Sequence, residues 1–313
     1  MPPIPSLGRL SRSEEAVEGI GGDREDACMR FYIVDVFAEG PYTGNPLAVL
    51  VLDRDVSADE MQRIAREVGF SETTFVAPSP REDGSWPVRV FTPDLEIPFA
   101  GHPSLGTAFV VREVLGDPSE VIRLSMGVGT IPVQVGPDGL LTMRQNQPQF
   151  GEVVEPDVVA SVLSVEAGDL RGDLPIQWAS TGLPCYCVPT ATLDALGRMH
   201  VDHPQFKRFF GELGHDKCNL LAFVELPDGS LRARCFMDDT GFAEDPATGS
   251  ANGDLAACLL HHGRGNGRLE YVVDQGVEMG RPSRLFVSAS VDGTTYDIRV
   301  GGHCRLVARG EWA

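Results

Sequence analysis

Polar and hydrophobic residues alternate first along Arg30–Ala38, where aromatic and β-branched side chains are frequent. This pattern predicts a β-strand with two unlike faces. Glycine, proline and asparagine gather at 40–46 and predict a turn. A second strand is predicted at Leu47–Leu52.

The next segment has the period of an amphipathic helix. Ser57 followed by Glu60 is a capping-box pattern that predicts the helix start, and Gly69 suits its C-terminus. Because a strand is predicted directly afterwards at Thr73–Ala77, Glu72 should lie at a helix-to-strand junction with its backbone held on both sides. The apolar positions that carry the helical period are Met61, Ile64, Ala65 and Val68.

An internal repeat divides the chain. Residues His102–Ala108 follow the pattern H-P-x-x-G-T-A, and Asp245–Ala251 follow D-P-x-x-G-S-A. Three shorter matches keep the same order around these motifs, which predicts a duplicated domain. They pair 75–76 with 223–224, 89–91 with 234–236, and Gly127 with Gly276.

The repeat predicts an α+β fold with two pseudo-symmetric domains, each a mostly antiparallel sheet wrapped around a central apolar helix. The two helices are expected at Pro103–Leu115 and Pro246–His262. We expect domains at 29–147 and 148–313, with a linker near Gln147–Pro156, after a disordered extension at 1–28. In this arrangement the last strand of the chain can return to the first domain and pack against it.

The composition of the chain excludes some classes of function and location. The formal charge of −19 over 313 residues argues against a surface that binds nucleic acid. No apolar run reaches the roughly 18 residues of a membrane span, and the first 28 residues lack the apolar region of a signal peptide. Seven cysteines without a C-x-x-C pattern predict reduced thiols and a cytoplasmic protein. Cys185 and Cys187 are expected to pack on one strand face, with a redox or metal pair as the alternative.

Both repeat motifs place a polar residue and then a proline at a predicted helix start. His102 and Asp245 are therefore expected to be N-cap residues, each followed by proline at the first helical position. Free backbone N–H groups and the positive end of the helix dipole attract anions. If a pseudo-two-fold axis relates the halves, the two helix starts would face one cleft and form a site for a carboxylate.

Structural alternatives remain open for each of these residues. Asp245 can be an N-cap without any further role. Ser250 and Thr107 can simply bond to the preceding helical turn. Glu72 can be a solvated loop charge. Its counterpart in the second half, counted back from the matching Phe-Val pair, is Leu220, so the carboxylate occurs in one half only.

Other motifs do not reach a cofactor site. Gly127-x-Gly129 lacks the third glycine and the helix of a nucleotide-binding loop. His200-x-x-His203 and the pair His261-His262 lack the remaining ligands of a zinc site. No G-x-S-x-G element is present. We therefore predict no metal and no cofactor.

Several segments together resemble one family. The chain is similar to the PhzF-like phenazine-biosynthesis isomerases, which have the diaminopimelate-epimerase-like fold. The resemblance runs from about residue 30 to the C-terminus. The segments that carry it are GNPLAV at 44–49, MQ-x-IA at 61–65, SETTFV at 71–76, FTP at 91–93, PFAGHP at 98–103, EDPATGSA at 244–251 and QGVEMGRP at 275–282.

The resemblance implies a site between two domains and a role for each matched residue. Glu72 is implied as the proton carrier, with His102, Asp245 and Ser250 at the other active-site positions. The ligand would be held by Ser71, Gly101, Thr248 and Gly249. The best-known activity of the family isomerises a dihydro-hydroxyanthranilate, and family members are usually dimers.

We therefore predict a cofactor-independent isomerase that moves a proton on a small anionic carboxylate through Glu72, acting as a homodimer. An epimerase or lyase on the same scaffold is the alternative, with Glu72 opposed by Asp245 or His102. Related epimerases use two cysteines as acid and base, and the repeat motifs here contain none. A non-catalytic small-molecule binding protein is the alternative from another class.

Overall fold

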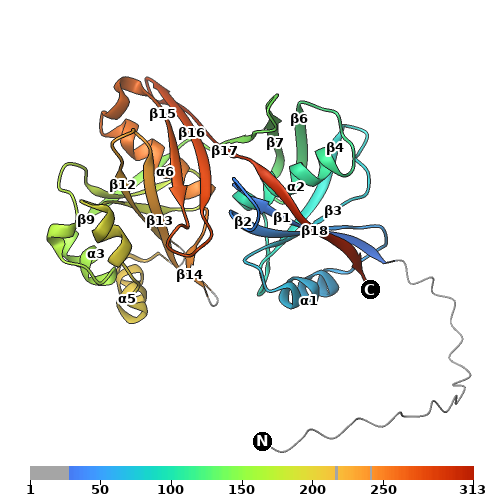
Figure 1. Ribbon diagram of the computed structural model, residues 1–313, viewed down its shortest axis with the longest axis horizontal. Helices are drawn as coiled ribbons and strands as arrows, with labels where there is room; N and C mark the ends of the chain where they lie inside the picture. The colour runs from blue at the N-terminus through green and yellow to red at the C-terminus, as the bar shows by residue number, and fades with distance from the viewer. Residues whose placement is uncertain (1–27, 216–217, 240–241) are drawn as a thin grey trace, which may run out of the picture.

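A computed structural model describes residues 28–215, 218–239 and 242–313, which form two lobes side by side (Figure 1). The expected extension at 1–28 lies, apart from Cys28, outside the described residues. Each lobe is built from strands around one buried helix. The α+β class with two pseudo-symmetric halves, predicted from the repeat, is confirmed.

The first lobe contains the N-terminal half of the fold and the last strand. Its elements are β1 (Met29–Val36), β2 (Asn45–Val51), α1 (Ala58–Val68), β3 (Thr73–Val76), β4 (Ser85–Phe91), β5 (Glu96–Ile97), α2 (Gly101–Glu113), β6 (Val121–Met126), β7 (Gly129–Val135), β8 (Leu141–Arg144) and β18 (Cys304–Trp312).

The second lobe repeats this order and adds helices at its start. Its elements are β9 (Gln149–Val154), α3 (Pro156–Val162), the 3-10 helix η1 (Ala167–Asp169), β10 (Ile176–Ser180), β11 (Cys185–Pro189), α4 (Leu193–Arg198), α5 (His203–Leu213), β12 (Asn219–Glu225), β13 (Leu231–Asp239), β14 (Phe242–Asp245), α6 (Gly249–His261), the 3-10 helix η2 (Arg264–Gly267), β15 (Arg268–Gln275), β16 (Ser283–Asp292) and β17 (Thr295–Gly302).

Strand pairing is the same in both lobes. The parallel pair β2–β3 corresponds to β11–β12, and the antiparallel pair β3–β4 corresponds to β12–β13. Phe91 pairs with Thr73, and its repeat partner Phe236 pairs with Leu220. This register makes Asn219, not Leu220, the counterpart of Glu72. The count from the Phe-Val pair was wrong by one residue, but the second lobe still has no carboxylate there.

The lobes exchange strands. After β8 the chain enters the second lobe as β9, which pairs with β10; after β17 it returns as β18, which pairs with β1. Figure 1 shows this red C-terminal strand among the blue strands of the first lobe. Direct pairing of β8 with β17 joins the two halves. The linker expected at Gln147–Pro156 is therefore wrong for most of its length, because Gln149–Val154 is a paired strand.

The central helices α2 and α6 are buried nearly all round, as apolar helices inside a wrapped sheet should be. Both begin where the proline pattern did not predict. Ala100 is the N-cap of α2, and its carbonyl accepts hydrogen bonds from the backbone N–H and the hydroxyl of Ser104. Pro103 is therefore the third helical residue, where its missing N–H also costs nothing.

In the second lobe, Asp245 ends β14 by pairing with Cys235, so α6 starts only after the N-cap Thr248. The prediction that His102 and Asp245 are N-caps followed by proline at the first helical position is wrong. The features predicted for α1 are confirmed. The Ser57 hydroxyl accepts from the backbone N–H of Glu60, and Gly69 ends the helix in a left-handed conformation.

Candidate active site

Four polar side chains that are distant in sequence meet where the two lobes touch. Asn45 at the start of β2, Glu72 and His102 come from the first lobe, and Asp245 comes from the second. His102 Nε2 lies 3.6 Å from Glu72 Oε2. Asn45 Nδ2 lies 3.3 Å from His102 Nδ1 and donates to Asp245 Oδ1 at 2.8 Å. The result is a continuous polar chain across the interface.

Glu72 lies one residue before β3, as the sequence predicted, in the short connection from the C-cap Gly69. Its side chain is 20 % exposed, the Oε2 atom that faces His102 is buried, and its backbone is held between two regular elements. A group in this setting can exchange a proton with a bound substrate without a large loss of orientation. The prediction that Glu72 is a solvated loop charge does not fit this position.

His102 is buried within the first turn of α2. Burial lowers the pKa of His102 to about 4, although the nearby Asp245 carboxylate acts in the opposite direction. His102 is therefore neutral at physiological pH. A neutral imidazole can donate one hydrogen bond and accept one without adding a charge to the site.

Asp245 is held by two side chains. Asn45 Nδ2 donates to Oδ1, and the Thr248 hydroxyl donates to Oδ2 at 2.5 Å. Burial raises the pKa of Asp245 to about 6, and the Glu72 carboxylate adds to the rise, while His102, Thr248 and Asn45 favour the charged form. The carboxyl can therefore change its protonation state in the physiological range, as acid/base sites require.

The first turns of α2 and α6 face each other. A Cβ atom on Gly101 would lie 3.9 Å from the backbone nitrogen of Ser250. Gly249 packs against the first lobe, because a Cβ there would lie 3.4 Å from the ring of Phe37. The starts of the two helices therefore lie close together, and the N–H groups in the first turn of a helix have no partner within that helix.

Of the remaining residues considered from the sequence, Ser71, Ser250 and Thr248 lie at the site and Thr107 lies in the core. Ser71 is half-buried beside Glu72, and the Ser250 side chain is 8 % exposed in the first turn of α6. Thr248 donates a hydrogen bond to Asp245 through its hydroxyl, and its expected role in holding the ligand stays a prediction. Thr107 donates to the Thr74 hydroxyl at 2.9 Å and belongs to the first-lobe core, not to its own preceding turn.

Three residues of the network were not singled out from the sequence, although they lie in the motif segments. Asn45 follows the turn glycine, Gln275 bonds to Thr248 and to the Asp245 carbonyl, and Arg281 reaches across the lobes to Asp35 at 2.7 Å. The only signal available was their place in GNPLAV and QGVEMGRP. The contacts that make them part of the site depend on the packing of the two lobes.

No group of three or more potential metal-binding side chains occurs within the described ranges. His262 bonds to Gln177, and His261 stacks on Phe150 with ring centres 4.1 Å apart. Cys185 and Cys187 are buried on β11 with sulfurs 3.9 Å apart, and burial raises the pKa of the Cys185 thiol. These thiols pack in the core.

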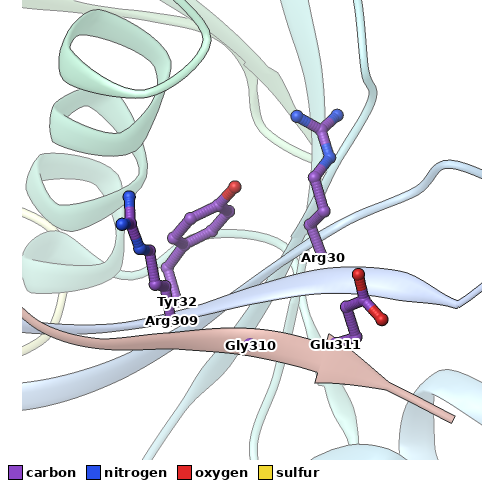
Figure 2. Close-up of a pocket in the computed structure, with 5 residues that line it drawn as sticks. All are labelled: Arg30, Tyr32, Arg309, Gly310 and Glu311. Atoms are coloured by element: carbon purple, nitrogen blue, oxygen red, sulfur yellow. The ribbon is translucent and has the colours of Figure 1, made fainter.

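An open depression of about 490 Å³ lies on the first lobe over the paired strands β1 and β18 (Figure 2). Arg30 is already paired with Asp53 at 2.7 Å, and the lining also contains Arg309 and Glu311, which have opposite charges. The depression contains none of the predicted site residues.

In the part of the chain that the structure covers, no helix is long and apolar enough to cross a membrane.

Comparison with known proteins agrees with this architecture. The model of the phenazine biosynthesis-like protein family matches residues 34–310. A trans-2,3-dihydro-3-hydroxyanthranilate isomerase from Pseudomonas aeruginosa is 33 % identical over 90 % of this chain and 98 % of its own length.

Two solved structures are also similar over most of their length. A Bacillus anthracis phenazine biosynthesis protein of the PhzF family has a TM-score of 0.82 at 29 % identity, covering 91 % of this chain and 99 % of that one. A protein from Pseudomonas aeruginosa described as a predicted epimerase has a TM-score of 0.74 at 33 % identity, covering 90 % and 98 %.

Proposed function

Because this chain belongs to the phenazine biosynthesis-like protein family and is an isomerase, we propose that Glu72 moves a proton between two carbons of a small unsaturated or cyclic carboxylate. The observation that carries the proposal is the position of the Glu72 carboxylate, 3.6 Å from a neutral, buried His102 and beside two helix starts that face each other. No hydride moves in such a reaction, so the chemistry requires no redox cofactor.

The substrate carboxylate would bind to the free backbone N–H groups around Gly101, Gly249 and Ser250, where the helix dipoles favour negative charge. This anchor would hold the acidic C–H next to Glu72. The carboxylate takes the proton and returns it to another carbon of the same substrate, and the polar groups of His102 and Asp245 stabilise charge that develops in between. One carboxyl serves both steps because the substrate stays anchored.

The substrate class follows from the relatives. We propose trans-2,3-dihydro-3-hydroxyanthranilate, the substrate named for the Pseudomonas aeruginosa relative, or a cyclic amino acid like it. The test is to incubate the protein with this compound and with other cyclic and unsaturated amino acids, following the absorbance of the conjugated diene. Rearrangement of at least one such acid supports the proposal. No reaction with any of them at high enzyme concentration contradicts it.

Epimerisation is the second candidate, because one similar structure is described as a predicted epimerase. In that reaction Glu72 would work against Asp245 or His102 on opposite sides of a stereocentre. A reaction in deuterated water separates the two candidates. Deuterium at a stereocentre of an unrearranged product indicates epimerisation, whereas a shifted double bond indicates isomerisation.

We also propose that the enzyme is a cytoplasmic homodimer. The buried thiols of Cys185 and Cys187 on β11 form no disulfide, which fits a reducing compartment. Light scattering coupled to gel filtration measures the assembly, and a mass near the 33.8 kDa of one chain would contradict the dimer.

A further inference from the structure

Asn45 contacts both His102 and Asp245, so its side chain bridges the two lobes at the reacting groups. It is 1 % exposed. Its Nδ2 atom lies 2.8 Å from Asp245 Oδ1 and 3.0 Å from the Ala247 carbonyl oxygen. These two oxygens fix the orientation of the amide, since the amide oxygen in the same place would face two acceptors.

This orientation determines which atom faces His102. An amide nitrogen donates and has no lone pair for accepting a hydrogen bond. His102 Nδ1 lies 3.3 Å from Asn45 Nδ2. The amide has two hydrogens for three neighbours, and His102 Nδ1 is the most distant of them. A proton on Nδ1 would point at a nitrogen that cannot accept it, which favours an unprotonated Nδ1 in the neutral ring. The ring proton then lies on Nε2, the atom that faces Glu72 at 3.6 Å.

We propose that Asn45 is a positioning residue that fixes the tautomer of His102, so that Nε2–H points to Glu72 and the substrate. Buried Nε2 has no hydrogen-bond partner within 3.5 Å among the described residues, and its proton is therefore available to a bound substrate oxygen or to the Glu72 carboxylate. His102 then acts as a neutral hydrogen-bond donor and does not present a base to the site.

The second lobe holds Asn45 in place through the preceding turn. Arg281 donates to the carbonyl oxygens of Thr43 and Gly44, and the Gly44 N–H donates to the Pro282 carbonyl. Gly44 has φ of 77°, and a Cβ there would lie 2.3 Å from the Val36 carbonyl oxygen, so only glycine fits. The tautomer is thus fixed by contacts from both lobes.

The tautomer is measured directly in the free enzyme. Protein labelled with ¹⁵N-histidine is examined by NMR at pH 7, and the His102 signals are assigned by their loss in His102→Gln. We expect a protonated Nε2 and an unprotonated Nδ1. A protonated Nδ1, or signals averaged between the two forms, would overturn the proposal.

Two substitutions test the role of Asn45 itself. Asn45→Ala should give mixed tautomers and lower kcat about tenfold or more, with a smaller change in KM. Asn45→Asp replaces the donor with an acceptor and should move the proton towards Nδ1, with a larger loss. Unchanged tautomer signals and kcat in Asn45→Ala would show that Asn45 only fills space.

Asn252→Ala is the matched control. Asn252 is fully buried near the site and donates to the Thr248 carbonyl and to Gln275, both at 2.9 Å. Its loss should destabilise the fold to a similar degree and leave the proton of His102 on Nε2, because Asn252 is linked to the network only through Thr248 and Gln275 in the bonds of the described residues. The catalytic consequence rests on the proposed function, but the NMR result does not, because it needs no substrate.

Discussion

Asp245→Asn separates the electrostatic role of Asp245 from its structural one. The substitution keeps the shape of the side chain and its acceptor for Asn45, and it removes the ionisable group. At a helix N-cap, Asn and Asp are nearly equal, which would predict little change in stability. Asp245 ends β14 instead, so its effect on stability comes from its raised pKa.

The magnitude follows from proton linkage. A carboxyl with a pKa near 3.9 in the unfolded chain and about 6 in the fold binds more protons when folded, so wild-type stability falls as pH rises from about 4 to 6. Two pKa units correspond to about 3 kcal/mol. Asp245 is partly accessible to solvent, and screening reduces this to roughly 1–3 kcal/mol. Asp245→Asn cannot ionise at this position and does not lose stability in this way. Its free energy of unfolding relative to that of wild type should therefore rise with pH.

Urea unfolding of both proteins at several pH values measures the difference. The pI near 4.7 makes pH 5 a practical lower limit, and about half of the change should remain between pH 5 and 7.5. Asp254, whose pKa burial raises to about 8, contributes equally to both proteins and cancels. Activity should fall sharply in the same variant. A stability difference that does not change with pH would refute the raised pKa, and full activity would remove Asp245 from the reaction.

Two further predictions concern the cofactor and the interface between the lobes. Protein treated with a chelator and dialysed should keep its isomerase activity, and recovery only after zinc or a nicotinamide is added would contradict the proposed chemistry. Arg281→Met should lower the free energy of unfolding by about 2–4 kcal/mol, because it leaves the buried Asp35 carboxylate without its cation. Adding Asp35→Asn should recover part of the loss in urea unfolding, and no recovery would show that the ion pair is not the cause.

Local signals in the sequence predicted what local contacts decide. The capping residues Ser57 and Gly69 end α1 as expected, because their hydrogen bonds lie within a few residues of the chain. The ordered matches around the two P-x-x-G motifs predicted the duplication. The same motifs gave the wrong helix starts, since the preference for proline at the first helical position was overridden by the Ala100–Ser104 bonds and the β14 pairing.

Contacts between the lobes could not be predicted in this way. Asn45 is distant in sequence from both His102 and Asp245, and Arg281 reaches the turn at Gly44 only when the two lobes pack together. The helices α3 to α5 were also not predicted. α4 and α5 lie between β11 and β12, where α1 lies between β2 and β3, but the sequence there shows no matching motif; α3 has no counterpart in the first lobe.

The central claim is that the Glu72 carboxylate carries the proton. Glu72→Gln keeps the size of the side chain and removes its acid/base function, and circular dichroism and substrate binding should remain close to wild type. With a substrate that the wild-type enzyme isomerises, single-turnover absorbance should show a loss of at least roughly a hundredfold in rate. A near-normal rate in a folded Glu72→Gln protein that still binds the substrate would contradict the account.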